Sequence, residues 1–295
     1  MGANMCTYIA VELCKQALKV SNEHVDETPA YDDTAPAAGG TGQVYVIIAA
    51  LDYKQTSNPL TCSIDGRNME KLARSCGIPD QNITAMYDEQ CTKENIAQVV
   101  QQVGGQCGSE DYFIFYYSGH GTNMKDQSGD EEDGQDEAFC FVTPDGQINY
   151  DSCMSDDDFS DLMTGALDSE VKTIILTDCC HSGTICDFEA GDWADRKAVS
   201  ITGCLDGQTS GDIGSGGIFT HSMLLAIGAI RDDGEDDYSV AKLYNKTVDE
   251  DDEVFHSKQD ITMQCSPGFR PNSMAWPLVP QSAAWQPPYG HRQMG

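Results

Sequence analysis

Basic residues are scarce in this chain. Its 295 residues include 17 Lys and Arg against 48 Asp and Glu, which gives a formal net charge of −31 at pH 7. A chain this acidic repels phosphate backbones, so we expect no nucleic-acid partner. The charge is compatible with cationic substrates, with bound divalent cations, or with solubility alone.

Long apolar runs and paired cysteine motifs are also missing. No apolar stretch approaches the roughly 20 residues that a membrane span needs, and no basic region followed by a long apolar region opens the sequence. The chain has 13 Cys, but none falls in the paired CxxC pattern of zinc sites. We therefore expect a soluble protein of a reducing compartment, the cytoplasm, without a membrane span.

Apolar runs alternate with helical patterns along the middle of the chain, and this order favours a parallel sheet with right-handed crossovers. Strands are predicted at Val44–Tyr53, Asn82–Tyr87, Tyr112–Tyr117, Ala138–Val142, Lys172–Asp178, Arg196–Cys204 and Met274–Val279. Helices are predicted at Tyr8–Val20, between Thr61 and Gly77, at Lys93–Val103 and Asp157–Leu167, from about Phe219, and at Tyr238–Val248. With 40% apolar residues, the chain is sufficient for one large α/β core.

Two of these strands end in turns that carry reactive side chains. The run Lys172–Thr184, KTIILTDCCHSGT, ends in a Cys pair, and the run Phe113–Thr122, FIFYYSGHGT, ends in a Ser-Gly-His-Gly turn. Open α/β sheets bind their ligands at the carboxyl ends of the strands. A catalytic dyad of Cys and His is therefore the first hypothesis.

Alternation along a strand indicates which side chains share a face. Because residues i and i+2 point the same way, Asp178 should lie beside Cys180. By the same rule Ser118 should lie beside His120. Cys179 points to the opposite side, where a free Cys commonly fills the core.

These motifs resemble those of the metacaspases. The separation of His120 and Cys180, 180 − 120 = 60 residues, is close to the roughly 50 residues known in caspases. YSGHG and DCCHSG resemble the paired metacaspase motifs, and the likeness continues through VSITGC at Val199–Cys204 and LDGQTSGD at Leu205–Asp212. It covers about Val44–Pro280.

The resemblance implies a caspase-like α/β fold, a mainly parallel central sheet flanked by helices on both faces in an α/β/α sandwich. Its order is similar to that of type I metacaspases, with one caspase-like domain and a monomer expected. The expected parts are an N-terminal helix and linker (1–43), a large-subunit-like part with the catalytic residues (44–197), a small-subunit-like part (198–280) and a flexible tail (281–295).

The resemblance also implies a cysteine endopeptidase that cleaves protein or peptide substrates after Arg or Lys. Cys180 matches the family's nucleophile and His120 its general base, and backbone N–H groups around Gly121 would form the oxyanion hole. The family's specificity pocket matches four residues of this chain: Cys62, Asp65, Ser118 and Asp178. Two carboxylates there suit a guanidinium or ammonium group and would repel an Asp side chain.

Calcium is the cofactor that the resemblance implies, as an activator. The family's ligand set matches Asp136, Asp156, Asp157 and Asp187, and calcium prefers six to eight oxygen ligands. Because Arg196 and Lys197 lie between the nucleophile strand and the small-subunit-like part, self-processing is expected at that junction.

Two other classes of function stay open. A calcium- or redox-responsive regulatory protein would keep the fold with little turnover, and extra thiols at Cys140, Cys153, Cys186 and Cys204 would allow disulfide or sulfenate formation. A metal site built from Cys179, Cys180 and His181 is the other, although adjacent cysteines rarely chelate one ion well. His221, in a helical stretch, is expected to be a core or surface residue.

Overall fold

The computed structural model describes residues 30–33, 42–125, 135–180, 185–188, 191–204 and 214–288. The strands among them are β1 (Val44–Ala50), β2 (Ile83–Tyr87), β3 (Tyr112–Ser118), β4 (Gly121–Lys125), β5 (Gln135–Cys140), β6 (Cys153–Ser155), β7 (Lys172–Asp178), β8 (Lys197–Thr202) and β9 (Thr262–Cys265). The α-helices are α2 (Cys62–Ser75), α3 (Lys93–Gly104), α4 (Asp156–Ala166), α5 (Ile218–Asp232) and α6 (Val240–Glu250). None of the described helices is long and apolar enough to cross a membrane.

Six strands form the main sheet in the order β2-β1-β3-β7-β8-β9. All neighbours are parallel except β9, which runs antiparallel to β8. The inner strands read as unbroken apolar runs because both of their faces are buried. The predicted mainly parallel sheet is confirmed.

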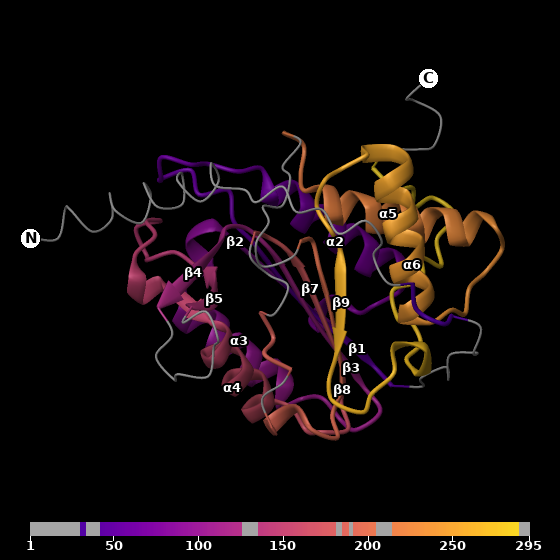
Figure 1. Ribbon diagram of the computed structural model, residues 1–295, viewed down its shortest axis with the longest axis horizontal. Coiled ribbons are helices and arrows are strands. Elements are labelled where there is room, and N and C mark those ends of the chain that lie inside the picture. The colour runs from indigo at the N-terminus through magenta and orange to yellow at the C-terminus, as the bar shows by residue number, and fades with distance from the viewer. Residues whose placement is uncertain are drawn as a thin grey trace, which may run out of the picture.

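The two faces of the sheet carry separate cores. Alternate residues of β1, such as Ile47 and Ala49, pack in a core that includes residues of α3 and α4, whereas Val46 and Ile48 pack with residues of α2, α5 and α6. Figure 1 shows α3 and α4 on one side of the sheet and α2, α5 and α6 on the other. This is the expected α/β/α arrangement.

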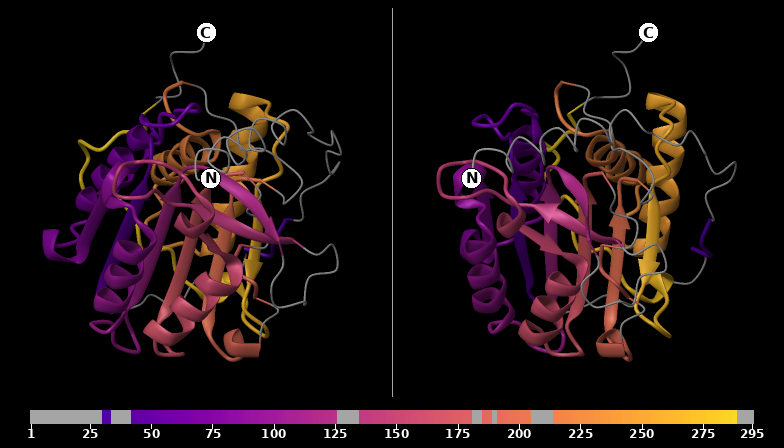
Figure 2. Two further views of the ribbon diagram at one scale, coloured as in Figure 1. Left: turned by 90° about the vertical axis from the view of Figure 1, so that its left-hand side faces the viewer. Right: turned by 60° about the vertical axis from the view of Figure 1, so that its left-hand side comes forward.

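A second, antiparallel sheet has the order β4-β5-β6 and lies beside the carboxyl ends of the main strands (Figure 2). The sequence predicted only one of its strands, at Ala138–Val142, and assigned the acidic residues before it to a loop. β4 was missed because it is short and mostly polar, and β6 because three residues are too few to show an apolar period. Residues 126–134 of that acidic segment lie outside the described part of the chain.

The prediction of a last strand at Met274–Val279 was wrong. Antiparallel pairing with β8 is made instead by β9, and the later segment forms only an isolated bridge between Ser239 and Ala275. Pro277 and Pro280 lack the N–H that a strand in a sheet needs, which explains why this apolar segment does not pair.

Residues 281–288, the first part of the predicted tail, contact the body of the protein. The Gln281 N–H donates to the Ser75 carbonyl at 2.9 Å, and the Arg231 guanidinium lies 5.3 Å from the centre of the Trp285 ring. Trp285 is buried against the α2 and α5 side of the sheet. The helix predicted at Tyr8–Val20 lies outside the described residues.

Candidate active site

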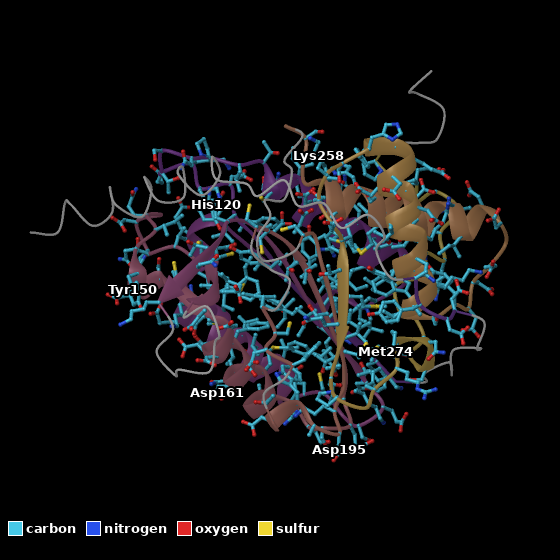
Figure 3. The ribbon with its side chains drawn as sticks, in the orientation of Figure 1. His120, Tyr150, Asp161, Asp195, Lys258 and Met274 are labelled. Atoms are coloured by element: carbon cyan, nitrogen blue, oxygen red, sulfur yellow. The ribbon has the colours of Figure 1, made fainter. Side chains whose placement is uncertain are left out.

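The candidate dyad lies where β3 and β7 end. Ser118 and Asp178 are register partners, and His120 and Cys180 each follow two residues later. His120 lies at the end of the molecule opposite Asp195, which precedes β8 (Figure 3). A Cβ atom on Gly121 would overlap the Cys180 carbonyl oxygen, so only glycine allows the two turns to touch there.

Burial separates the two adjacent cysteines. Cys179 is 1% exposed and belongs to the core on the α3 and α4 side, whereas Cys180 is half-buried. The strand alternation therefore predicted their different environments correctly. His181 lies outside the described residues.

The imidazole of His120 is held by the loop that follows β1. Its Nε2 atom lies 2.8 Å from the Asn58 carbonyl oxygen. Because a carbonyl only accepts hydrogen bonds, Nε2 carries the proton in this contact, and Nδ1 of the neutral ring is left as the basic nitrogen. Sequence analysis missed Asn58, since nothing local to a loop residue indicates which side chain its carbonyl will meet.

Tyr53 contacts both the ring and the main chain of His120. Its ring centre lies 4.5 Å from that of the imidazole, and its hydroxyl accepts the His120 N–H at 2.9 Å and donates to the Cys140 carbonyl at 2.7 Å. Tyr53 has a φ of +54°, a conformation that non-glycine residues rarely adopt and that is concentrated at functional sites. A Cβ on Gly119 would lie 2.5 Å from the Tyr53 hydroxyl, so glycine is required there too.

Three of the four residues predicted to form the specificity pocket meet in a buried acidic cluster. Asp65 is fully buried, and its Oδ2 accepts hydrogen bonds from the Ser118 hydroxyl at 3.1 Å and the Gly217 N–H at 2.9 Å. The fourth, Cys62, is buried one turn before Asp65 at the start of α2. The Asp178 carboxylate contacts the same glycine, because a Cβ on Gly217 would overlap it.

The first turn of α5 also contacts this cluster. Thr220 donates to Asp178 Oδ2 from its backbone N–H at 2.9 Å and from its hydroxyl at 2.7 Å. Carboxylates are favoured at helix N-termini, which explains why a buried Asp is tolerated here. His221 is 1% exposed, with Nδ1 2.8 Å from the Gly217 carbonyl and 3.8 Å from Asp65 Oδ1, so it is a buried residue beside the cluster.

Asp52 fixes the start of α2 and thus the position of Asp65. The Ser63 N–H and hydroxyl donate to its two oxygens at 2.6 and 2.7 Å, and Lys54 Nζ lies 2.8 Å away. Burial alone would raise the pKa of Asp52, but the hydrogen bonds from Lys54 and Ser63 outweigh it and hold the pKa below its ordinary value. Asp52 is therefore ionised at neutral pH.

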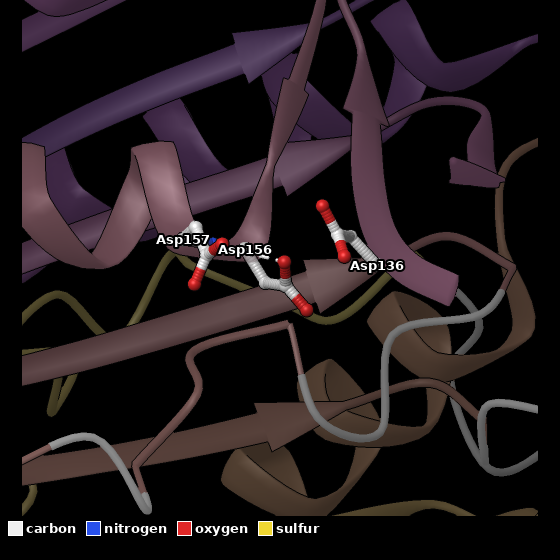
Figure 4. Close-up of side chains that lie close together, drawn as sticks. All are labelled: Asp136, Asp156 and Asp157. Atoms are coloured by element: carbon white, nitrogen blue, oxygen red, sulfur yellow. Dashed lines mark hydrogen bonds between the residues drawn. The ribbon is translucent and has the colours of Figure 1, made fainter. Parts of the chain in front are cut away.

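Three predicted calcium ligands form one cluster. Asp136 on β5 and Asp156 and Asp157 at the start of α4 each offer an oxygen within 4.8 Å of the others (Figure 4). Burial raises the pKa of Asp156 to about 8, and the neighbouring charges of Glu137 and Asp136 add to the increase. Oxygen donors that repel one another in this way fit a hard divalent cation such as calcium.

The fourth predicted ligand, Asp187, is not part of this group of three. It is half-buried, has a φ of +40°, and follows Cys186. Burial raises the pKa of the Cys186 thiol to about 12, and the charges of Asp156 and Asp187 contribute, so both carboxylates lie near this thiol.

The residues of the predicted self-processing junction, Arg196 and Lys197, both belong to the packed structure. Arg196 donates to the carbonyls of Leu167, Thr164 and Asp192 at 2.8 to 2.9 Å, which caps the carboxyl end of α4. Lys197 is the first residue of β8. Both lie at the end of the sheet opposite His120, and self-processing at this junction stays a prediction.

An open, mainly parallel α/β sheet with a thiol and an imidazole at neighbouring strand ends defines the class as caspase-like. Residues 46–189 match the family model described as metacaspase, peptidase C14 domain, and these residues belong to the metacaspase family. The resemblance found in the sequence motifs is thereby confirmed.

The individual relatives agree with this assignment. The chain is 30% identical to Metacaspase-2 of Arabidopsis thaliana, with 63% of this chain and 51% of that protein covered. It is 32% identical to Metacaspase-1 of Candida glabrata, with 50% and 39% covered. The chain thus spans about half the length of the curated relatives it matches.

A solved structure supports the fold alone. The crystal structure of protein GSU0716 from Geobacter sulfurreducens aligns with a TM-score of 0.59 at 21% identity, covering 79% of this chain and 97% of that one.

Proposed function

We propose that this chain is a calcium-dependent cysteine endopeptidase that cleaves after Arg or Lys. Its metacaspase domain supports a cysteine peptidase, and protein substrates follow from that class. The observation that carries the specificity is the pair of buried carboxylates, Asp65 and Asp178, at the strand ends that also carry His120 and Cys180.

Cys180 acts as the nucleophile and His120 as the general base. His120 Nδ1 removes the thiol proton, the thiolate attacks the scissile carbonyl, and the imidazolium then protonates the leaving amine. The hydrogen bond from Nε2 to the Asn58 carbonyl keeps Nδ1 directed toward the reaction. N–H groups at Gly121 and Cys180 stabilise the oxyanion.

The acidic pocket selects the residue before the scissile bond. A guanidinium or ammonium group entering it gains charge-assisted hydrogen bonds to Asp65 and Asp178, whereas an Asp side chain would be repelled. The Ser118 hydroxyl and the Gly217 N–H hold Asp65 in place, and Cys62 forms part of the wall.

Asp136, Asp156 and Asp157 would hold the calcium ion, with Asp187 as a further ligand. Calcium, when bound, would supply the positive charge that balances these carboxylates, which come from β5 and the start of α4. The far end of β5 contacts the dyad, because the Cys140 N–H donates to the His120 carbonyl at 3.0 Å. Through this strand the ligand cluster influences the position of the base.

Hydrolysis of two fluorogenic peptides, one with Arg and one with Asp before the scissile bond, tests the proposal with and without calcium. We expect calcium-dependent cleavage of the Arg peptide that is lost in Cys180→Ala. Cleavage of the Asp peptide would overturn the role of the acidic pocket. Absence of cleavage of either peptide, with calcium bound, would favour the regulatory alternative.

A further inference from the structure

Two thiols face each other across the small sheet. Cys140 on β5 is the register partner of Cys153 on β6, and their Sγ atoms lie 4.0 Å apart. Both residues are buried, at 0% and 3% exposure. Neither takes part in the catalytic chemistry proposed above.

The backbone geometry allows these two thiols to bond. The Cys140 N–H donates to the His120 carbonyl and its carbonyl accepts from Tyr53, so both groups face away from β6. Cys140 and Cys153 therefore form a non-hydrogen-bonded pair, in which Cα atoms are about 4.5 Å apart and side chains are closest. That separation lies within the range of about 4.4 to 6.8 Å that disulfides span.

The pair also lies between the two parts of the candidate site. Cys140 follows Asp136 by four residues on β5, and Cys153 precedes Asp156 by three residues. On the other side, the Cys140 main chain bonds to His120 and to the Tyr53 hydroxyl. A covalent bond here would act on the carboxylate cluster and on the support of the base together.

We propose that Cys140 and Cys153 form a reversible thiol–disulfide site whose oxidant is a hydroperoxide, and that the disulfide form is the less active one. Formation of this disulfide does not depend on the proposed function. The expected effect of the disulfide on calcium binding and on activity rests on the proposed function.

The chemistry proceeds in two steps. The Cys153 sulfur, the less buried of the two, attacks the peroxide, the O–O bond breaks, and a sulfenic acid and one molecule of water or alcohol form. The Cys140 sulfur then attacks the sulfenic sulfur, the S–S bond forms, the S–O bond breaks, and water leaves with the remaining thiol proton. Two electrons pass from the sulfurs to the peroxide oxygen, and a thiol reductant reverses the change.

The shorter distance between the two sulfur atoms is the physical reason why the disulfide form is expected to be less active. The sulfur atoms must approach from 4.0 Å to about 2.05 Å, the length of a disulfide bond. This draws β5 and β6 together between Asp136 and Asp156 and shifts the Cys140 main chain that holds His120. Because the Cys140 thiol is hydrogen-bonded to Cys153 and buried, its pKa is well above the ordinary value, and oxidation requires local opening and is slow.

The primary sequence makes the bond easy to detect. Trypsin releases both residues in one peptide, Asp126–Lys172, which contains no other Cys, Lys or Arg before its end. The full-length, calcium-free protein is treated with hydrogen peroxide, denatured in the presence of an alkylating reagent and digested with trypsin. The masses of the peptides are then measured by mass spectrometry. We expect this peptide to lose two hydrogens and to escape alkylation, and to recover both thiols after dithiothreitol treatment.

Substitutions separate the pair from other oxidised thiols. The same treatment is applied to Cys153→Ala and to Cys186→Ala, a matched control that removes another buried thiol. The disulfide should be absent only in Cys153→Ala. Two alkylated cysteines in the wild-type peptide, under conditions that oxidise the Cys180 thiol, would overturn the proposal.

Calcium binding is measured without activity, in a Cys180→Ala background. Peroxide should reduce the calcium-induced rise in Tm, and the additional Cys153→Ala substitution should abolish that sensitivity. A disulfide that leaves the calcium response unchanged would overturn the coupling. Absence of any calcium response in the reduced protein would refute the proposed function and leave the peptide result valid.

Discussion

Asp178 and Asp65 are both buried carboxylates, but each is held by different donors. Asp178 accepts two hydrogen bonds from Thr220, and Asp65 accepts one from Ser118 and one from Gly217. These bonds hold the carboxylate oxygens in place. Under the proposed specificity, little ordering is therefore left when a cationic side chain binds.

Asp178→Asn keeps the shape of the side chain and removes its charge. We expect kcat/KM for the Arg peptide to fall about 10- to 100-fold, since hydrogen bonds to charged groups contribute about 1.5 to 3 kcal/mol. Asp80→Asn, which removes an equal charge from an exposed residue, is the control and should change little. Equal losses in the two variants would show that net charge, not the pocket, determines the rate.

Tyr53→Phe tests the support of His120. The variant leaves the His120 N–H without its buried acceptor and the Cys140 carbonyl with only the Tyr117 hydroxyl at 3.3 Å, so we expect about 1 to 3 kcal/mol less stability in urea unfolding. kcat should fall while KM stays nearly constant, because the acidic pocket is untouched.

Tyr238→Phe is the matched control, because the buried Tyr238 hydroxyl has no hydrogen-bond partner among the described residues. This variant should leave the stability and kcat unchanged.

At the scale of elements, the contacts of Arg196 make a prediction about proteolysis. Cleavage between Arg196 and Lys197 would require α4 and the start of β8 to separate, so we expect no fragment ending at Arg196 after calcium treatment. Intact-mass measurement over the time course of peptide hydrolysis checks this. A fragment of that mass in the wild type would mean that this end of the sheet opens.

Arg196→Ala should also lower the free energy of unfolding, by about 1 to 3 kcal/mol, because three carbonyls lose a charged donor. Lys197→Ala removes only a surface ion pair with Glu170, which contributes about 0 to 1 kcal/mol. Urea unfolding of the two variants compares them directly, and similar losses would refute the capping role.

At the scale of the whole molecule, buried carboxyl groups give the metal-free protein an unusual pH dependence. Burial is the largest cause that raises the pKa of Asp156 to about 8 and of Asp251 to about 6, from an ordinary value of 3.8. Between 3.8 and each raised pKa, the folded state keeps a proton that the unfolded state has released. Stability from these groups is therefore present at low pH and is lost as pH rises toward about 8.

Thermal unfolding in a calcium chelator, followed from about pH 5 to pH 8 at constant ionic strength, measures this loss. We expect the Tm of the wild type to fall more steeply than that of Asp156→Asn, which has no titrating group at that position. Calcium should reverse the trend in the wild type, because the cation binds ionised carboxylates. Parallel curves for the two proteins would contradict the prediction.

The element positions and the candidate dyad followed from local patterns in the sequence. Apolar periodicity located β1, β3, β7 and the helices because each pattern is set by neighbours a few residues apart. Strand alternation likewise separated Cys179 from Cys180, and it placed Asp178 beside Cys180 and Ser118 beside His120. The family motifs then added Asp65 and the carboxylates of the cluster.

The tertiary structure alone decided the partners that come from distant segments. Asn58, Tyr53 and Thr220 contact the site only after the chain has folded, because β1, β3, β7 and the start of α5 meet at one edge of the sheet. Pairing of β9 rather than Met274–Val279 with β8 likewise depends on backbone hydrogen bonds that apolar patterns do not encode. The sequence by itself determined where the candidate reactive residues lie along the chain, because strand patterns are local. Tertiary packing determined which side chains support them and which carboxylates lie beside them, because those partners come from distant segments.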